Sequence, residues 1–201
     1  MAKEGYRFVF VTLGLAAAAL AVGWFVVAVA LTAAAAAIAG FFRDPARISP
    51  DGDGIVVSPA DGKVVAVPDA SDADNRRLSI FLSPLDVHIN RAPMNGRVAD
   101  IRYQTGHFLA AYKGKASDEN ERNAVDLVDD AGTTLRIVQI AGFLARRIVC
   151  DVRRGDPLKR GERFGMIMFG SRVDLFLPRD ATVEVQPGQR VRGGETIVAR
   201  L

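Results

Sequence analysis

The 201-residue chain is poor in the side chains that cross-link small domains or bind metals, with one cysteine, two histidines and one tryptophan. A single cysteine, Cys150, excludes an intrachain disulfide framework, and with only two histidines it is too little for a zinc site. The excess of positive charge is small, since 26 lysines and arginines face 23 acidic residues. Nucleic-acid binding usually shows as a concentrated basic stripe, so no nucleic-acid partner is expected.

Charged residues are absent from residues 8–42, a stretch filled mostly by alanine, valine, leucine and phenylalanine. As one helix it would be roughly 50 Å long, well beyond a hydrocarbon core of about 30 Å. It is too long for the apolar part of a signal peptide, and a helix of a soluble core would show charges on one face. Residues 1–42 are therefore predicted to be a membrane anchor. It would be one tilted span, a helical hairpin turning near Gly23-Trp24, or a shallow interfacial pair of helices.

Basic residues flank this stretch on both sides, with Lys3 and Arg7 before it and Arg43 and Arg47 after it. The positive-inside rule therefore gives no asymmetry between the two flanks. Positive charge at both ends favours a hairpin or re-entrant anchor whose two ends face the cytoplasm.

Residues 43–201 predict one mainly β domain. Short runs rich in valine and isoleucine recur between turn signals, among them GKVVAVP, RLSIFLS, TLRIVQIAG and RVDLFLP. Many short strands with frequent turns are typical of a barrel or sandwich, and the C-terminal VEVQPGQRVRGGETIV resembles a barrel-sandwich hybrid segment of the lipoyl type. Short helices are expected only at residues 144–149 and around residues 108–112.

Four stretches stand out from this background of strands: SPADGK (58–63), SPLDVHINRAP (83–93), DENERN (118–123) and RFGMIMFGSRVDLFLP (163–178). In an extended strand Asp86, His88 and Asn90 would share one face. In the last stretch a Gly-Ser pair separates two apolar strands, and glycine there marks close backbone approach or strain. Taken singly, each stretch is more simply a turn, a solvated face, a loop or a bulge.

Taken together, these stretches resemble the phosphatidylserine decarboxylase family in its short bacterial and archaeal form. The resemblance covers nearly the whole chain, and six ordered motifs are far more specific than any one of them. The motifs are FFRDP (41–45), SPADGKV (58–64), SPLDVHINRAPMNG (83–96), ASDENERN (116–123), QIAGFLARRIV (139–149) and RFGMIMFGSRVDLFLP (163–178).

The resemblance implies an enzyme without a metal or an external cofactor, which makes a covalent pyruvoyl group from an internal serine. The matching position is Ser171, whose hydroxyl would attack the carbonyl of Gly170. Elimination from the resulting ester would divide the chain into a β subunit (1–170) and an α subunit (171–201), which stay together as a heterodimer. Higher oligomers are left open.

The same resemblance assigns His88 as the general base of this self-cleavage and Asp61 as the residue that orients it. In turnover it implies decarboxylation of phosphatidylserine to phosphatidylethanolamine and CO₂ through a Schiff base. Longer members carry two histidines three residues apart in the second motif, and here the second position is Arg91. His88 is therefore expected to act in both maturation and turnover, with His107 or a water as the alternative for one step.

Two further expectations concern the substrate. Arg91, Arg146 and Arg147 are candidates to hold the lipid phosphate or carboxylate. A two-chain phospholipid does not leave the bilayer cheaply, so the anchor is expected to hold the site at the headgroup plane of the inner cell membrane, facing the cytoplasm.

Three other functions compete with this interpretation. A membrane-anchored serine hydrolase would use Asp61, His88 and Ser171 without self-cleavage, but the chain lacks a G-x-S-x-G elbow. A lipoyl-like carrier or binding module would present a modified lysine at a hairpin tip, and the PGQ and RGGE turns contain none. A membrane-anchored peptidase would need a histidine-rich zinc set that two histidines do not supply.

Overall fold

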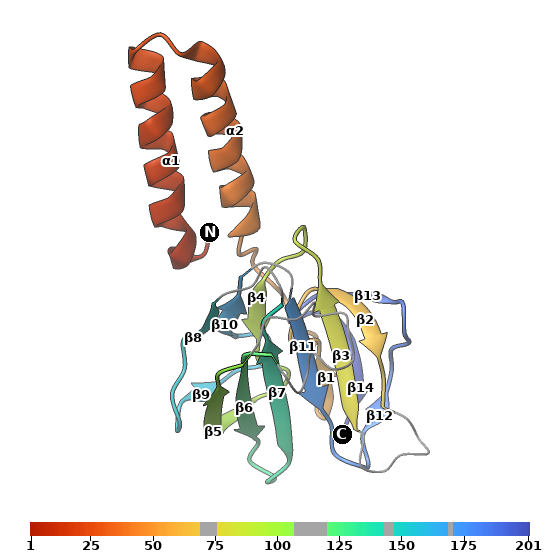
Figure 1. Cartoon of the computed structure of the whole chain (residues 1–201). Coiled ribbons are helices and arrows are strands. Elements are labelled where there is room, and N and C mark those ends of the chain that lie inside the picture. Colours follow the sequence, from red (N-terminus) through yellow and green to blue (C-terminus); the bar gives the residue numbers. More distant parts are fainter. Residues whose placement is uncertain (69–75, 107–119, 143–146, 169–170) are drawn as a thin grey trace. The chain divides into compact units, whose positions relative to one another are not determined.

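The computed structural model describes residues 1–68, 76–106, 120–142, 147–168 and 171–201. The chain divides into two compact units, Met1–Ala46 and Arg47–Leu201. The first is helical, and the second confirms the mainly β fold predicted from the sequence (Figure 1).

The first unit is a helical hairpin made of α1 (Lys3–Ala21) and α2 (Phe25–Phe41). Gly23 in the turn between them has a φ of 80°, a left-handed conformation that glycine adopts without strain. Buried alanines, such as Ala16 and Ala35, let the two helices lie close together. By length and composition α1 can cross a membrane, whereas α2 has only 17 residues. Two helices joined by a turn fit both the hairpin and the interfacial pair among the predicted arrangements, and the way they associate with a membrane stays a prediction.

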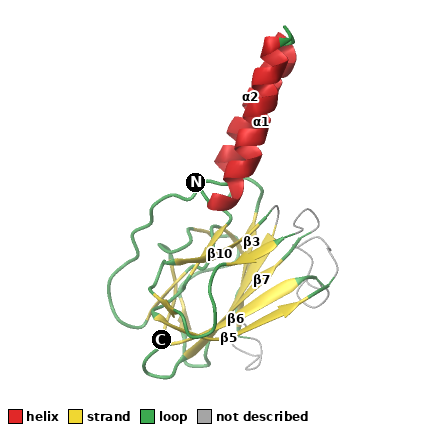
Figure 2. Ribbon diagram, turned by 90° about the vertical axis from the view of Figure 1, so that its left-hand side faces the viewer, coloured by secondary structure: helices red, strands yellow, loops and turns green. Residues whose placement is uncertain are grey.

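The second unit contains three antiparallel sheets among its described strands (Figures 1 and 2). The largest has the strand order β13-β2-β3-β11-β7-β6-β5-β9, and the smaller sheets have the orders β4-β10-β8 and β1-β14-β12. The strands are β1 (Ile55–Val57), β2 (Gly62–Ala66), β3 (Arg77–Leu82), β4 (Ile89–Arg91), β5 (Gly96–Gln104), β6 (Arg122–Val128), β7 (Thr134–Ile140), β8 (Ile148–Cys150), β9 (Pro157–Leu158), β10 (Arg163–Ile167), β11 (Ser171–Phe176), β12 (Thr182–Val183), β13 (Arg190–Val191) and β14 (Ile197–Arg200).

The prediction of a short helix at residues 144–149 is wrong for the residues that the structure describes. Ile148 and Val149, at the end of the expected helix 144–149, belong to β8 and pair with Ile167 and Met166 of β10. The β-branched pair thus joins a ladder whose partner lies far along the chain, and a local pattern does not show this. The other expected helix, residues 108–112, lies outside the described residues.

The two sides of the eight-stranded sheet carry different side chains. Leu78, Leu175, Ile137 and Val125 form one row of directly paired residues across β3, β11, β7 and β6, and all four are buried in the hydrophobic core. We call their side the inner face. Because side chains alternate along a strand, residues of even number in β11, β7 and β6 lie on the opposite side, the outer face.

Candidate active site

Ser171 is the first residue of β11, at the middle of the large sheet, where it pairs with Leu82 of β3. It is completely buried, and within the described part of the chain its hydroxyl has no hydrogen-bond partner. Leaving a buried hydroxyl unbonded costs about 1–3 kcal/mol, so such a group has a reason in strain, in a catalytic role or in a bound water. Ser79 of β3 has a buried hydroxyl of the same kind, and the motif singles out Ser171. Gly170, the other half of the predicted cleavage site, lies outside the described residues.

His88 lies directly before β4 and is also completely buried. Its backbone carbonyl accepts a hydrogen bond of 3.2 Å from the N–H of Ile167, at the end of β10. The chain runs on from β10 to Ser171, so this bond holds His88 beside the segment that leads into the candidate serine.

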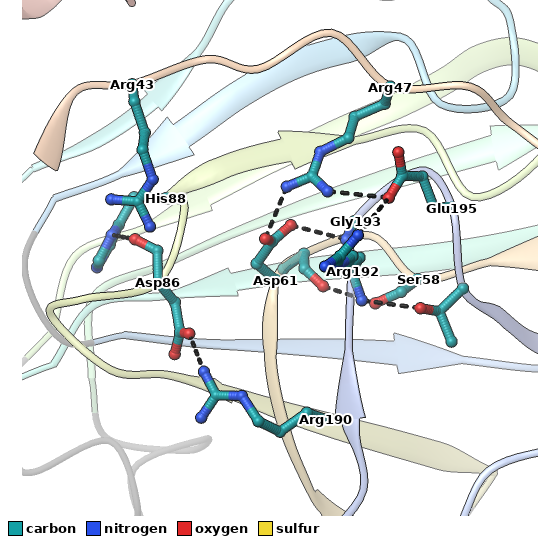
Figure 3. A network of polar contacts seen from close by, with 12 residues as sticks. Arg43, Arg47, Ser58, Asp61, Asp86, His88, Arg190, Arg192, Gly193 and Glu195 are labelled. Carbon is teal, nitrogen blue, oxygen red and sulfur yellow. Dashed lines mark hydrogen bonds and ion pairs between the residues drawn. The ribbon is translucent and has the colours of Figure 1, made fainter. Parts of the chain in front are cut away.

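The imidazole of His88 contacts the backbone of Asp86, with 2.9 Å between its Nδ1 and the Asp86 carbonyl oxygen (Figure 3). A carbonyl oxygen only accepts hydrogen bonds, so Nδ1 carries a proton there. In the neutral ring the lone pair is then on Nε2, which is the nitrogen able to take a proton from a nucleophile.

Asp61 lies just before β2, and its carboxylate is bound from two sides (Figure 3). One oxygen accepts a 2.7 Å hydrogen bond from the Arg47 guanidinium, and the other accepts a 2.8 Å bond from the Gly193 N–H. Burial raises the pKa of the Asp61 carboxyl, against the lowering effect of Gly193 and Arg47, and the charge of Asp86 adds to the rise. The predicted role of Asp61 in orienting His88 stays a prediction, since the contacts that the structure shows for Asp61 are with Arg47 and Gly193.

Asp86 is a candidate residue to which the sequence analysis gave no role. It is buried, and its carboxylate accepts a 2.8 Å hydrogen bond from the Ser83 N–H and forms an ion pair with Arg190. Its backbone carbonyl at the same time holds the His88 ring. The available signal was its position two residues before His88 in the motif. The expected strand face shared by Asp86, His88 and Asn90 is wrong, because residues 84–86 form a turn and β4 begins only at Ile89.

Arg47 was expected only as a flank of the anchor, yet it is part of this polar network. Its guanidinium bridges Asp61 and Glu195, at 2.7 Å and 3.0 Å, and its side chain is largely buried. The Arg47–Glu195, Asp61–Gly193 and Asp86–Arg190 contacts each join a residue that precedes the predicted cleavage site in the sequence to one that follows it (Figure 3). They would therefore connect the two proposed fragments.

The three arginines proposed for substrate binding differ from one another. Arg91 is buried, and its guanidinium donates a 3.1 Å hydrogen bond to the Gly161 carbonyl. Arg147 is exposed, and its own carbonyl accepts a 3.2 Å bond from the N–H of Met168. Arg146 and His107 lie outside the described residues.

Comparison with known proteins gives one consistent family. The family model for phosphatidylserine decarboxylase matches residues 34–199. A phosphatidylserine decarboxylase proenzyme from Nocardia farcinica is 49% identical over 205 residues, which cover 98% of this chain and 86% of the relative. A proenzyme of the same name from Magnetococcus marinus is 44% identical, with 100% and 95% covered. One from Pelodictyon phaeoclathratiforme is 47% identical, with 80% and 77% covered.

These matches extend over both the His88 motif and the strand that begins with Ser171. The order of motifs in the sequence, the buried serine and the relatives point the same way, and the chain belongs to the phosphatidylserine decarboxylase family.

Proposed function

We propose that this protein is a membrane-bound, pyruvoyl-dependent decarboxylase that converts phosphatidylserine to phosphatidylethanolamine and CO₂. The reaction is supported by the family and by relatives that are named as proenzymes. The observation that carries the proposal to the level of residues is the hydroxyl of Ser171, which is buried and unbonded within the described residues at the middle of the sheet.

The proposed maturation is self-cleavage between Gly170 and Ser171. His88 takes the proton of the Ser171 hydroxyl, and the oxygen attacks the Gly170 carbonyl carbon, so the acyl group moves from nitrogen to oxygen. Loss of the Ser171 Cα proton then breaks the Cβ–O bond and releases the Gly170 carboxylate. The dehydroalanine left at position 171 tautomerises and takes up water, which gives the pyruvoyl group and ammonia.

In turnover the pyruvoyl group supplies a carbonyl that binds the substrate amine and accepts the electron pair left by CO₂. His88 is proposed as the acid that returns a proton to the substrate carbon, because imidazole titrates near neutral pH. The negative charge of Asp61 is proposed to favour the protonated form of the His88 ring. Asp61 lies close enough to Asp86 for the charge of Asp86 to raise its pKa, and the backbone of Asp86 holds the ring (Figure 3).

For the lipid headgroup we propose Arg147 and Arg146, with Arg91 as a third candidate. The exposure of Arg147 suits a contact with a phosphate, whereas the guanidinium of Arg91 is bound to the Gly161 carbonyl. A guanidinium binds phosphate and carboxylate oxygens through paired N–H donors.

The two proposed fragments would remain one molecule, bound to a membrane through the hairpin of α1 and α2. Residues 171–201 contribute β11 between β3 and β7, and β14 between β1 and β12. The proposed location is the inner cell membrane with the β unit facing the cytoplasm, and the apolar α1 supports membrane association.

Intact mass spectrometry of the purified, detergent-solubilised protein tests this proposal. We expect two species parted between Gly170 and Ser171, with a pyruvoyl group at the start of the shorter one. Ser171→Ala should remain a single chain and release no CO₂ from phosphatidylserine in liposomes. A wild-type chain that stays whole and is labelled by a serine-directed reagent would instead support the hydrolase alternative and overturn the proposal.

A further inference from the structure

Three buried amide side chains form a hydrogen-bonded row, which we call the amide row: Asn123 of β6, Gln139 of β7 and Asn90 of β4. Asn123 Nδ2 donates to Gln139 Oε1 at 2.9 Å, and Gln139 Nε2 donates to Asn90 Oδ1 at 2.9 Å. Gln139 Nε2 also donates to the Val149 carbonyl of β8, at 3.2 Å. All three side chains lie in the protein interior, with at most 1% of their surface exposed.

The backbone fixes the direction of this row. The Val149 carbonyl only accepts, so it is the nitrogen of the Gln139 amide that faces it, and the Gln139 oxygen must accept from Asn123. Gly165 of β10 provides the space for this arrangement. A Cβ there would lie 2.3 Å from the Val149 oxygen and 3.0 Å from Gln139 Nε2.

The row connects the sheet that carries Ser171 to β4, the strand that begins directly after His88. Gln139 pairs directly with Val173, two residues after Ser171, and both side chains lie on the inner face. Asn90, which accepts the hydrogen bond from Gln139, is two residues after His88 and belongs to the sheet β4-β10-β8. A single hydrogen bond therefore links the strand that follows His88 to the neighbour of the strand that begins with Ser171.

Packing alone does not explain these three amides. Burying an amide is unfavourable unless its groups are bonded, and within the described residues Asn90 Nδ2 and Asn123 Oδ1 have no partner. Apolar side chains would fill the same space without unbonded polar atoms. Hydrogen bonds are directional, however, and they fix how two sheets lie against each other more sharply than apolar contacts do.

We propose that the amide row is a positioning device for self-cleavage, which holds β4, the strand directly after His88, in a fixed position relative to β11, the strand that begins with Ser171. Its members act through the two reacting residues. The inference rests on the proposed function, and it adds Gln139, Asn90 and Asn123 as residues that set the rate of maturation.

The test measures the rate of self-cleavage of freshly synthesised full-length chain in detergent, by mass spectrometry over time. In Gln139→Met the side chain keeps its length and loses its hydrogen bonds, and cleavage should slow by about 10- to 100-fold, the range expected for a misplaced reacting group. The matched control is Ile137→Ala, two residues away on the same face of β7, which loses core packing and keeps the amide row. It should cleave within about twofold of the wild type at a temperature where both variants are folded.

A second variant separates positioning from stability, provided that every cleavage rate is expressed per folded molecule, with the folded fraction measured by circular dichroism at each pH. In Gln139→Glu the ionised side chain has no proton for Val149 or Asn90, whereas the protonated form can donate one. The ratio of its cleavage rate to that of the wild type should therefore rise as the pH falls. This ratio also decides the question if Gln139→Met fails to fold.

The outcomes separate the two proposals. A wild-type chain that does not cleave overturns the proposed function, and the inference falls with it. If the wild type cleaves while Gln139→Met matches Ile137→Ala, or while the Gln139→Glu ratio does not change with pH, the amide row has only a structural role and the inference alone is wrong.

Discussion

The two faces of the eight-stranded sheet carry polar groups of opposite character. On the inner face the described polar side chains of β6, β7 and β11 are neutral, namely Asn123, Gln139 and Ser171. On the outer face of the same strands the polar side chains are charged, apart from Thr134 at the start of β7. Asp126 there receives hydrogen bonds from Arg102 at 2.6 Å and from Arg136 at 2.7 Å.

The outer face also carries a buried ion pair and a cavity. Arg172 and Asp174 lie 3.0 Å apart on β11, next in sequence to Ser171 but on the other side of the sheet. The cavity, of about 550 Å³, is lined by arginines that include Arg77 and Arg136. Charges are tolerated where they pair or reach solvent, whereas neutral amides are less costly to bury. The strands β6, β7 and β11 thus carry their ion pairs on the outer face, and on the face that carries Ser171 they carry neutral amides that form directional hydrogen bonds.

The largest effect is expected when a charge is moved to the inner face. Asn123→Asp has nearly the same shape, but its carboxylate would face the accepting oxygen of Gln139. At neutral pH it should lower the free energy of unfolding by about 3–5 kcal/mol, the range for an uncompensated buried charge. Burial raises the pKa of such a carboxyl, so the loss should appear as the pH rises above about 4 and fade in acid. Urea unfolding in an uncleaved Ser171→Ala background measures it, and a loss independent of pH would contradict the explanation.

Truncating two neighbouring residues of β7 compares how much apolar packing on each face contributes to stability. Ile137 lies on the inner face and is 1% exposed, and Val138 lies on the outer face and is 8% exposed. Ile137→Ala should cost about 2–5 kcal/mol of unfolding free energy because it leaves a cavity in the core. Val138→Ala should cost about 1–2 kcal/mol, for the smaller apolar surface lost. The same urea experiment measures both, and equal losses would show that the outer face is packed like the core.

A smaller effect is expected from removing the charge on the outer face. Asp126→Asn is the reverse of the first exchange, and its partners Arg102 and Arg136 are each half exposed, at 49%. Asp126 itself is buried, but asparagine keeps an oxygen that accepts from both arginines, and these reach solvent. The loss should therefore be below about 1 kcal/mol and should shrink as salt is added, because salt screens charges that reach solvent. Unfolding at low and high ionic strength measures it. A loss as large as that of Asn123→Asp would remove the contrast between the faces.

The smallest effect concerns Tyr103 of β5, which pairs directly with Asn123 of β6 and is exposed. A hydrogen bond to Glu121, with smaller contributions from burial and from the charge of Glu121, raises the pKa of Tyr103 to about 12. The contribution of the protonated phenol to stability is present below pH 10 and is lost as the pH rises through about 12. An ultraviolet titration of the wild type minus that of Tyr103→Phe isolates this group, and Glu121→Gln should move its midpoint back toward 10. A midpoint already near 10 in the wild type would refute the bond.

Local pattern predicted much of this fold. The apolar runs TLRIVQIAG and RVDLFLP predicted two central strands. The uncharged stretch and the glycine at 23 agree with the two helices and the turn of the first unit, whereas its arrangement in a membrane stays a prediction. Pattern failed where the partner lies far along the chain. Nothing near Ile148 indicates that it pairs with β10, and nothing near Arg47 indicates an ion pair with Glu195, 148 residues away.

The site shows the same limit. Ser171 and His88 were predicted from motifs that are contiguous in the sequence, and their catalytic roles stay predictions. In the sequence Gln139 is a single polar residue in an apolar strand. Only the register of β6, β7 and β11 shows that it lies beside Asn123, on the same face as Ser171. Asp61 was predicted from a motif, but its contacts with Arg47 and Gly193 come from tertiary structure.

The position of β11 between β3 and β7 has a consequence for folding history. A chain cut before Ser171 would have its new ends inside the sheet, and the short piece would be hydrogen-bonded on both sides. Once unfolded, the two pieces would have to find each other by diffusion, so refolding would depend on protein concentration, whereas the uncut precursor folds as one molecule. The mature form would then be reached by one route only, and its persistence would be set by the rate of unfolding and not by an equilibrium with its parts.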